Sequence, residues 1–326
     1  MKNRELKNFT EPIREELDQF NQFFSDQMRS KVGLVELIVR YILRQKGKKI
    51  RPILVLLSAK TLGNVNEHTY RGAVLVELLH TATLVHDDVV DNSDTRRGLP
   101  SINAIWKNRI AVLMGDYLLA RGLQIAVDND EFNFLKVITN TVKRMSEGEL
   151  LQIQKIRKLN NDEETYYRIV SDKTASLFST CTTIGAMSIT EDKDVIDDFR
   201  QFGELLGIAF QIKDDILDFE GTSSIMGKPT GNDLRDKKLT LPIIYALNQA
   251  EKQEVKNIKN LIRGKLTSKD INSIFQFVER YDGLGYARRK AREFADQAIE
   301  IIQKYPDTES RQALVDLVNF ILERKN

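Results

Sequence analysis

Residues 87–91 read Asp-Asp-Val-Val-Asp, and residues 214–218 repeat the pattern as Asp-Asp-Ile-Leu-Asp. Each copy lies in an apolar stretch and places carboxylates at positions i, i+1 and i+4. Because residues four apart stack on one face of an α-helix, each copy predicts a carboxylate cluster on a helical face. Like charges at this spacing destabilise a helix, so the pair favours a compensating cation. Carboxylate clusters without Cys or His are typical of Mg²⁺ sites.

The alternative for either copy alone is a solvated helix face, which is the usual role of an acidic cluster. A single Asp-Asp-x-x-Asp also arises by chance often enough to be weak support for a metal site. Two copies inside apolar helices, accompanied by basic segments, favour the metal-binding interpretation.

Composition bounds the remaining possibilities. The chain has 326 residues, 41% hydrophobic and 29% charged, which is ample for a large core. Its net charge of +2 creates no overall field that would attract nucleic acid. Cys181 is the only cysteine, which fits the reducing cytoplasm where we expect the protein. No apolar run approaches the roughly 18 residues of a transmembrane segment, and the polar N-terminus lacks a signal-peptide core.

Apolar residues recur at spacings of three and four nearly everywhere, and alternating strand-like runs are missing. Nothing resembles a linker, so we predict a single all-α domain over residues 1–326, a bundle of about 12–13 helices. Two loops rich in Gly, Ser and Pro follow the acidic motifs at residues 92–100 and 221–233. The predicted helices cover residues 11–29, 32–45, 52–62, 67–92, 109–127, 131–157, 163–188, 192–219, 239–249, 252–263, 268–279, 284–304 and 308–324.

Basic residues gather close to the acidic motifs. Residues 46–52 concentrate cations before a predicted helix, either as a solvated helix end or as an anion site at a helix N-terminus. Arg96 and Arg97 form a second cationic pair, and His80 lies on nearly the same helical face as Asp87. Acids and bases around one cavity suit a diphosphate held through Mg²⁺ and a second anion held by cations. No glycine-rich nucleotide motif is present.

The sequence resembles the trans-isoprenyl diphosphate synthases, or polyprenyl synthetase family, of the long-chain type, from about Lys46 to Pro242. The matching segments are residues 47–52, 77–82, the two acidic motifs, 96–98, 115–116, 173–175, Gln211 and 228–236. The resemblance implies the isoprenoid synthase fold, helices around a central cavity, and assembly as a homodimer. In keeping with the balanced charge we expect no nucleic-acid partner, and we expect at most a transient membrane contact for product release.

The resemblance implies a role for each matched residue. About three Mg²⁺ ions would be held by Asp87, Asp88, Asp91, Asp214, Asp215 and Asp218. The allylic diphosphate would be bound by Arg96, Lys173, Thr174, Gln211, Lys228 and Lys238. Isopentenyl diphosphate would be bound by Lys48, Arg51, His80 and Arg97. The residues expected to matter most for catalysis are Asp87, Asp88, Asp91, Asp214, Asp215, Lys173 and Lys228.

The implied reaction joins isopentenyl diphosphate to a geranyl, farnesyl or geranylgeranyl diphosphate. The allylic C–O bond ionises, the isopentenyl double bond attacks the cation, and released pyrophosphate accepts the proton. Metal ions and cations stabilise the charge that develops on the leaving diphosphate. Because the product is again an allylic diphosphate, elongation can repeat.

Product length is expected to depend on the helix that precedes Asp87. Short-chain members of the family place bulky aromatics four or five residues before the first Asp, where this chain has Thr83 and Ala82. An isoprene unit spans roughly three helical residues, so a growing chain would pass Thr83 and continue along Leu79 and Val76. We therefore predict an all-trans product of about C30–C50. The alternative is that another helix closes the tunnel early, as in a farnesyl or geranylgeranyl diphosphate synthase.

Three further interpretations remain at this point. A terpene cyclase shares the helical architecture, but such enzymes normally replace the second acidic motif and lack the isopentenyl site. A regulatory subunit of a heteromeric synthase would usually have lost its acidic motifs, and both are intact here. The chain could still be the catalytic subunit of a heterodimeric synthase.

Overall fold

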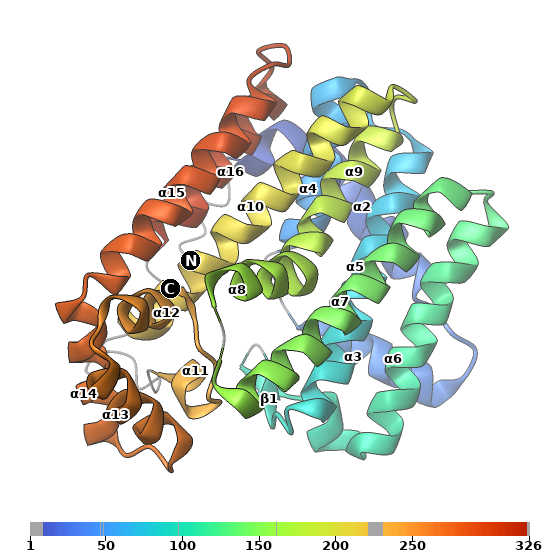
Figure 1. Cartoon of the computed structure of the whole chain (residues 1–326). Coiled ribbons are helices and arrows are strands. Elements are labelled where there is room, and N and C mark those ends of the chain that lie inside the picture. Colours follow the sequence, from blue (N-terminus) through green and yellow to red (C-terminus); the bar gives the residue numbers. More distant parts are fainter. Residues whose placement is uncertain are drawn as a thin grey trace.

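The computed structural model describes residues 9–45, 47, 49–96, 98–160, 162–220 and 231–324. The predicted binding residues Lys48, Arg97 and Lys228 lie outside these ranges. The described residues are predominantly helical with almost no strands, which confirms the all-α prediction (Figure 1). Within them, strands β1 (Thr95–Arg96) and β2 (Leu99–Pro100) form one antiparallel pair in the loop after the first acidic motif.

The helices follow the predicted ranges closely. They are η1 (Glu11–Ile13), α2 (Arg14–Gln27), α3 (Gly33–Arg44), α4 (Ile50–Leu62), α5 (Glu67–Val90), α6 (Ile102–Asp128), α7 (Phe132–Lys158), α8 (Glu163–Val170), η2 (Ser171–Ala175), α9 (Ser176–Met187), α10 (Lys193–Glu220), α11 (Asn232–Arg235), α12 (Leu241–Gln249), α13 (Lys252–Arg263), α14 (Ser268–Arg280), α15 (Gly283–Ile302) and α16 (Glu309–Glu323).

Two predicted helices differ from their predicted form, and α11 lies outside every predicted helix range. The helix expected at 109–127 starts at Ile102, because the Ser101 hydroxyl caps it by accepting the Ala104 N–H at 3.3 Å. Lys107, at φ 71°, interrupts the helical backbone inside this segment. The helix expected at 163–188 contains one π-helical turn, η2, between α8 and α9. Residues 171–174 are all polar, so apolar periodicity gives no signal across the turn.

Two hydrophobic cores share α10, which crosses the middle of the molecule beside α15 (Figure 1). The first half of α10 packs Phe199 and Phe202 into a core with α4, α5 and α9. Its second half packs Ile212 and Ile216 into a core with α12, α14 and α15. Because one helix serves both cores, we keep a single domain as our interpretation.

Helix α6 bears on the predicted absence of a transmembrane segment. In the described part of the chain it is the one helix long and apolar enough to cross a membrane, judged by length and composition alone. Its most apolar 18-residue window has a mean hydropathy of 1.5 and is 39% buried. The predicted absence is therefore not confirmed. Core helices of soluble proteins pass the same test, and α6 packs along α5.

Candidate active site

The first acidic motif lies at the end of α5, with Asp91 as the C-cap residue, and its carboxylates have different surroundings. Asp88 is buried, and its Oδ1 accepts two hydrogen bonds from the Arg96 guanidinium, with Nε at 2.8 Å. Asp87 and Asp91 are exposed. Partial loss of solvent raises the pKa of Asp87, which the charge of Lys173 opposes. Arg96 thus fixes one carboxylate, while the other two stay accessible to a ligand.

The second acidic motif lies near the end of α10. Asp215 is buried, its Oδ2 accepts the Tyr166 hydroxyl at 2.6 Å, and its Oδ1 accepts Gln211 Nε2 at 2.8 Å. Burial, followed by the charge of Asp233, raises the pKa of Asp215 to about 8. The Asp214 side chain has a different partner: its Oδ1 accepts a hydrogen bond from Arg324 Nη2. The two adjacent carboxylates are therefore held by different parts of the chain.

Asp218, the third carboxylate of the second motif, binds backbone in this structure. Its Oδ1 and Oδ2 accept the backbone N–H groups of Asn232 and Asp233, each at 3.1 Å. These bonds place Asp233 beside the motif, where burial and then Asp218 raise its pKa to about 6. Asp233 lies in a segment that matched the family, although it was not among the predicted site residues.

Turn η2 carries Lys173 and Thr174 to the second motif. Thr174 Oγ1 donates to Gln211 Oε1 at 2.8 Å, so Thr174, Gln211 and Asp215 form one hydrogen-bonded chain. Lys173 Nζ donates to Gln152 Oε1 at 2.8 Å and forms an ion pair with Glu149, both on α7. The Lys173 charge also acts on Asp87 of the first motif and on Asp233 beside the second. Lys173 therefore lies between the two acidic regions.

Lys238 also connects the two acidic regions. Its Nζ donates to Asp236 Oδ2 at 3.0 Å and lies 3.8 Å from Asp233 Oδ1, and its charge interacts with Asp91.

A cavity lies between α7, α8, η2, α10 and the segment after α11. It is lined by predicted site residues, among them Lys173, Thr174, Gln211, Asp215 and Lys238.

A second cavity is lined by Asp88 and Arg96 together with Lys49 and Glu77. Lys49 has a left-handed backbone, and its ammonium donates a hydrogen bond to Asn21. Lys49 belongs to the basic segment but was not among the predicted site residues.

The predicted isopentenyl diphosphate residues Arg51 and His80 are both turned inward. The guanidinium of Arg51 lies 5.8 Å from the centre of the Phe178 ring. His80 is only 7% exposed. Their predicted contact with isopentenyl diphosphate stays a prediction.

The predicted chain-length residues continue inward along α5. Thr83 is half-buried and donates its hydroxyl to the His80 carbonyl at 2.8 Å. Ala82, Leu79 and Val76 are buried in the first core. Their assignment to a hydrocarbon tunnel stays a prediction.

The donor set fits a divalent cation that is completed by substrate. Within the described ranges, no three acidic or histidine side chains are close enough to form a metal cluster on their own. Mg²⁺ usually binds one or two carboxylates together with substrate phosphates and water, so such a cluster is not required. Loss of solvent raises the pKa values of Asp87, Asp215 and Asp233, so their negative charges are poorly stabilised in the metal-free site. A bound divalent ion would stabilise these charges.

The prediction missed several side chains that hold the site residues. Tyr166 lies two helical turns before Lys173. A tyrosine there fits the apolar face of a helix, so its position in the sequence did not indicate that its hydroxyl group binds a site residue. Glu149 and Gln152 lie three apart on α7, which is the spacing of one helical face. Arg324 directly follows α16, outside the segments that matched the family, and was not among the predicted site residues.

An all-α fold with paired carboxylate motifs and cations around a cavity defines a synthase of the isoprenoid type. The chain belongs to the polyprenyl synthetase family, whose model matches residues 32–278. It is therefore a prenyltransferase of the polyprenyl diphosphate synthase type, as the motifs predicted. The alternatives of a short-chain synthase or a heterodimeric subunit are not favoured, because the close homologues are long-chain polyprenyl diphosphate synthases.

Three similar proteins support this membership. The chain is 36% identical to the all-trans-nonaprenyl-diphosphate synthase (geranyl-diphosphate specific) of Rhodobacter capsulatus, over 96% of both chains. It superimposes on the decaprenyl diphosphate synthase of the same organism with a TM-score of 0.92 and 33% identity, covering 98% and 99% of the two chains. The polyprenyl synthase of Caulobacter crescentus, complexed with calcium and isoprenyl diphosphate, gives a TM-score of 0.90 and 31% identity over 98% of each chain.

Proposed function

We propose that this chain condenses isopentenyl diphosphate repeatedly with an allylic diphosphate and releases an all-trans polyprenyl diphosphate of about C30–C50. The observation that carries the proposal is the hydrogen-bonded chain from Thr174 through Gln211 to Asp215. Lys173 lies beside it, between the two acidic regions. Together, this chain and Lys173 bring carboxylate, amide, hydroxyl and ammonium groups to one cavity, as binding of a metal-complexed diphosphate requires.

The allylic diphosphate would be bound by cations and hydrogen-bond donors around this cavity, namely Arg96, Lys173, Thr174, Gln211, Lys228 and Lys238. Lys173 and Lys238 would stabilise negative charge as the diphosphate leaves, because both ammonium groups interact with each acidic region. About three Mg²⁺ ions would supply Lewis-acid stabilisation of that charge. They would be held by Asp87, Asp88, Asp91, Asp214 and Asp215, with Asp218 released from its backbone contacts.

Isopentenyl diphosphate would be bound beside the first motif by Lys48, Arg51, His80 and Arg97. The cavity lined by Lys49 and Arg96 supports this location, since it lies directly against Asp88. Pyrophosphate released in the first step would accept the proton, so the mechanism needs no side-chain base.

We also propose that the protein is a cytoplasmic homodimer that releases its product at a membrane surface. Large apolar side chains on α6 and α7 remain exposed, with Leu113 at 60%, Phe132 at 56% and Leu150 at 66%. Burying such side chains against a second copy would lower the free energy of the assembly. Sedimentation of the wild type and Leu113→Glu would test this: a dimer that the variant dissociates is expected, and a monomeric wild type would contradict it.

The test of function is to incubate the purified chain with Mg²⁺, farnesyl diphosphate and labelled isopentenyl diphosphate, and to size the dephosphorylated products. We expect a product well beyond C20 and no product with a chelator present. A band at C15 or C20 would contradict the long-chain assignment. No product from the folded chain alone, with activity restored by a second polypeptide, would favour the heterodimer alternative.

A matched pair of variants tests the metal assignment. Asp87→Asn removes a proposed Mg²⁺ ligand and should lower kcat by at least about a hundredfold. Asp197→Asn makes the same change on the exposed surface of α10, where Asp197 pairs with Arg200, and should leave activity unchanged. Equal activity of the two variants would contradict the assignment.

A further inference from the structure

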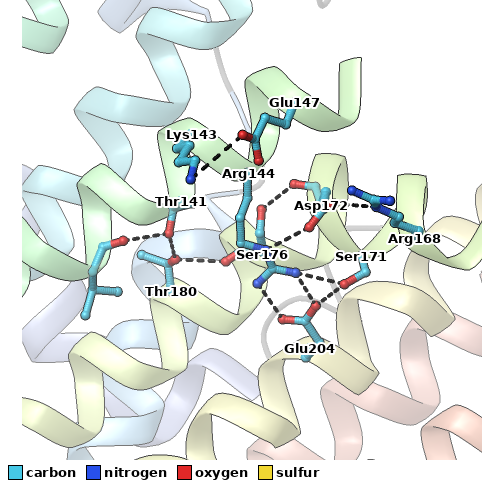
Figure 2. Close-up of polar contacts among 11 residues, drawn as sticks. Thr141, Lys143, Arg144, Glu147, Arg168, Ser171, Asp172, Ser176, Thr180 and Glu204 are labelled. Carbon is cyan, nitrogen blue, oxygen red and sulfur yellow. Dashed lines mark hydrogen bonds and ion pairs between the residues drawn. The ribbon is translucent and has the colours of Figure 1, made fainter. Parts of the chain in front are cut away.

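A charged network binds turn η2 through side chains that are not among those lining the cavity. Figure 2 shows Arg144 of α7 reaching between Ser171 and Asp172 of the turn and Glu204 of α10. These side chains are largely buried: the exposed fraction is 28% for Arg144, 20% for Asp172 and 17% for Glu204. The reaction proposed above uses none of the four.

Arg144 contacts both the turn and α10. Its Nε donates to Asp172 Oδ1 at 2.9 Å, and its Nη2 donates to Ser171 Oγ at 2.8 Å. The same Nη2 donates to Glu204 Oε1 at 2.7 Å, while Nη1 lies 3.3 Å from Glu204 Oε2. Ser171 completes the ring by donating its hydroxyl to Glu204. A guanidinium suits this role because its planar fork fixes the directions of several hydrogen bonds at once.

The backbone leaves the turn little freedom on either side. A Cβ on Gly148 of α7 would lie 3.0 Å from Asp172 Cβ and 3.1 Å from Lys173 N. A Cβ on Gly207 of α10 would lie 2.5 Å from Ala175 Cα. Turn η2 is therefore confined between two helices at their glycines, and Arg144 connects the same three elements through its side chain.

The network and the active site share one short segment. Asp172, which Arg144 binds, directly precedes Lys173 and Thr174 of the cavity. Glu204 lies two turns before Gln211 on α10, and Gln211 binds both Thr174 and Asp215. A shift of the turn relative to α10 would thus move Lys173 and break the Thr174–Gln211 hydrogen bond.

We infer that Arg144 is a positioning residue for the allylic diphosphate site, which fixes the π-helical turn to α10 so that Lys173 and Thr174 reach the diphosphate. This inference rests on the proposed function, because it takes Lys173 and Thr174 to be ligands of that diphosphate. π-Helical turns within α-helices are often found at functional sites, and this one presents two of the cavity's polar side chains.

The experiment compares steady-state kinetics for the two substrates in three single variants. Arg144→Met removes the fork, and Arg144→Lys keeps the charge without the fork. Arg168→Gln is the matched control, since Arg168 pairs with the same Asp172 at 3.9 Å from an exposed position. We expect Arg144→Met to raise the KM for the allylic diphosphate about tenfold, with Arg144→Lys in between. The KM for isopentenyl diphosphate and the kinetics of Arg168→Gln should stay unchanged.

A double-mutant cycle with Lys173→Ala separates positioning from stability. If Arg144 acts through Lys173, Arg144→Met should raise the allylic KM by less than about twofold in the Lys173→Ala background. A full additional increase there would contradict the inference. So would a lower Tm of Arg144→Lys with both KM values unchanged, which is the result expected of a purely structural network. If Arg144→Met does not fold, the KM values of Arg144→Lys test the inference.

The same cycle distinguishes failure of the inference from failure of the proposed function. If Lys173→Ala raises the allylic KM and the Arg144 variants do not, only the positioning role is wrong. If Lys173→Ala itself leaves the allylic KM unchanged in an active enzyme, the proposed role of Lys173 is wrong, and the inference is wrong with it.

Discussion

Tyr166 donates its phenolic hydrogen to Asp215 Oδ2 over 2.6 Å, and both side chains are buried. The bond orients the Asp215 carboxylate, and Gln211 occupies the other oxygen. A residue that orients a metal ligand typically changes metal affinity by about ten- to a hundredfold when it is removed. If Asp215 holds Mg²⁺ as proposed, Tyr166 acts on catalysis through it as a positioning residue, although Tyr166 was not among the predicted site residues.

We predict that Tyr166→Phe raises the Mg²⁺ concentration for half-maximal activity by about tenfold, because Asp215 loses one of its two side-chain donors. Activity measured against Mg²⁺ concentration checks this. Tyr305→Phe is the matched control: Tyr305 donates to Asp198 of the same α10 at 3.0 Å, away from both acidic motifs. An unchanged Mg²⁺ dependence in Tyr166→Phe, or an equal change in both variants, would contradict the positioning of Asp215 by Tyr166.

The helices could be predicted from the sequence because apolar spacing reports burial directly, and the acidic motifs because their pattern repeats. Turn η2 could not be predicted, since residues 171–174 are polar and carry no apolar spacing that would report the shift of the backbone hydrogen bonds by one residue. The roles of Tyr166 and Arg144 could not be predicted for another reason. Their partners, Asp215 and Glu204, lie far away along the chain, and only packing of α7, α8 and α10 brings them together.

The raised pKa of Asp215 predicts a pH-dependent stability of the metal-free protein. The folded pKa of about 8 lies above the reference value of 3.8, so unfolding releases a proton between these limits. The contribution of Asp215 to folding free energy is therefore fully present below about pH 4 and is lost as the pH rises to about 8. Asp215→Asn removes this titration. With a chelator present, its Tm relative to the wild type should increase by several degrees between about pH 5 and pH 9.

Asp197 supplies the opposite case. Hydrogen bonds from Arg200 and Gln201 lower the pKa of Asp197, so its contribution is present above the unfolded pKa and lost only in acid. The Tm difference between Asp197→Asn and the wild type should stay constant over the same interval, from about pH 5 to pH 9. A constant difference for Asp215→Asn as well would show that Asp215 is not protonated at neutral pH in the metal-free protein.

Thr83→Phe should shorten the product to about C15, because the ring would fill the path of the growing chain one helical turn before Asp87. Thr83 is half-buried, so the larger side chain can extend from α5 without entering the first core. Sizing of the products from farnesyl and geranyl diphosphate checks this. Thr139→Phe makes the same change at an exposed position of α7 and should leave product length unchanged. Long products from Thr83→Phe would contradict the tunnel assignment.

Gly207 should tolerate no side chain, because a Cβ there would lie 2.5 Å from Ala175 Cα and 2.8 Å from Ala175 Cβ. We predict that Gly207→Ala lowers the free energy of unfolding by about 1–3 kcal/mol, the usual cost of overpacking. Gly33→Ala is the control, since no heavy atom lies within 4 Å of its added Cβ and alanine favours the helix that begins there. Urea unfolding of both variants measures the difference. Ala175 is the last residue of turn η2, so Gly207→Ala should also raise the KM for the allylic diphosphate. If Gly207→Ala were as stable as the wild type, the turn could move away from α10, and the prediction would be wrong.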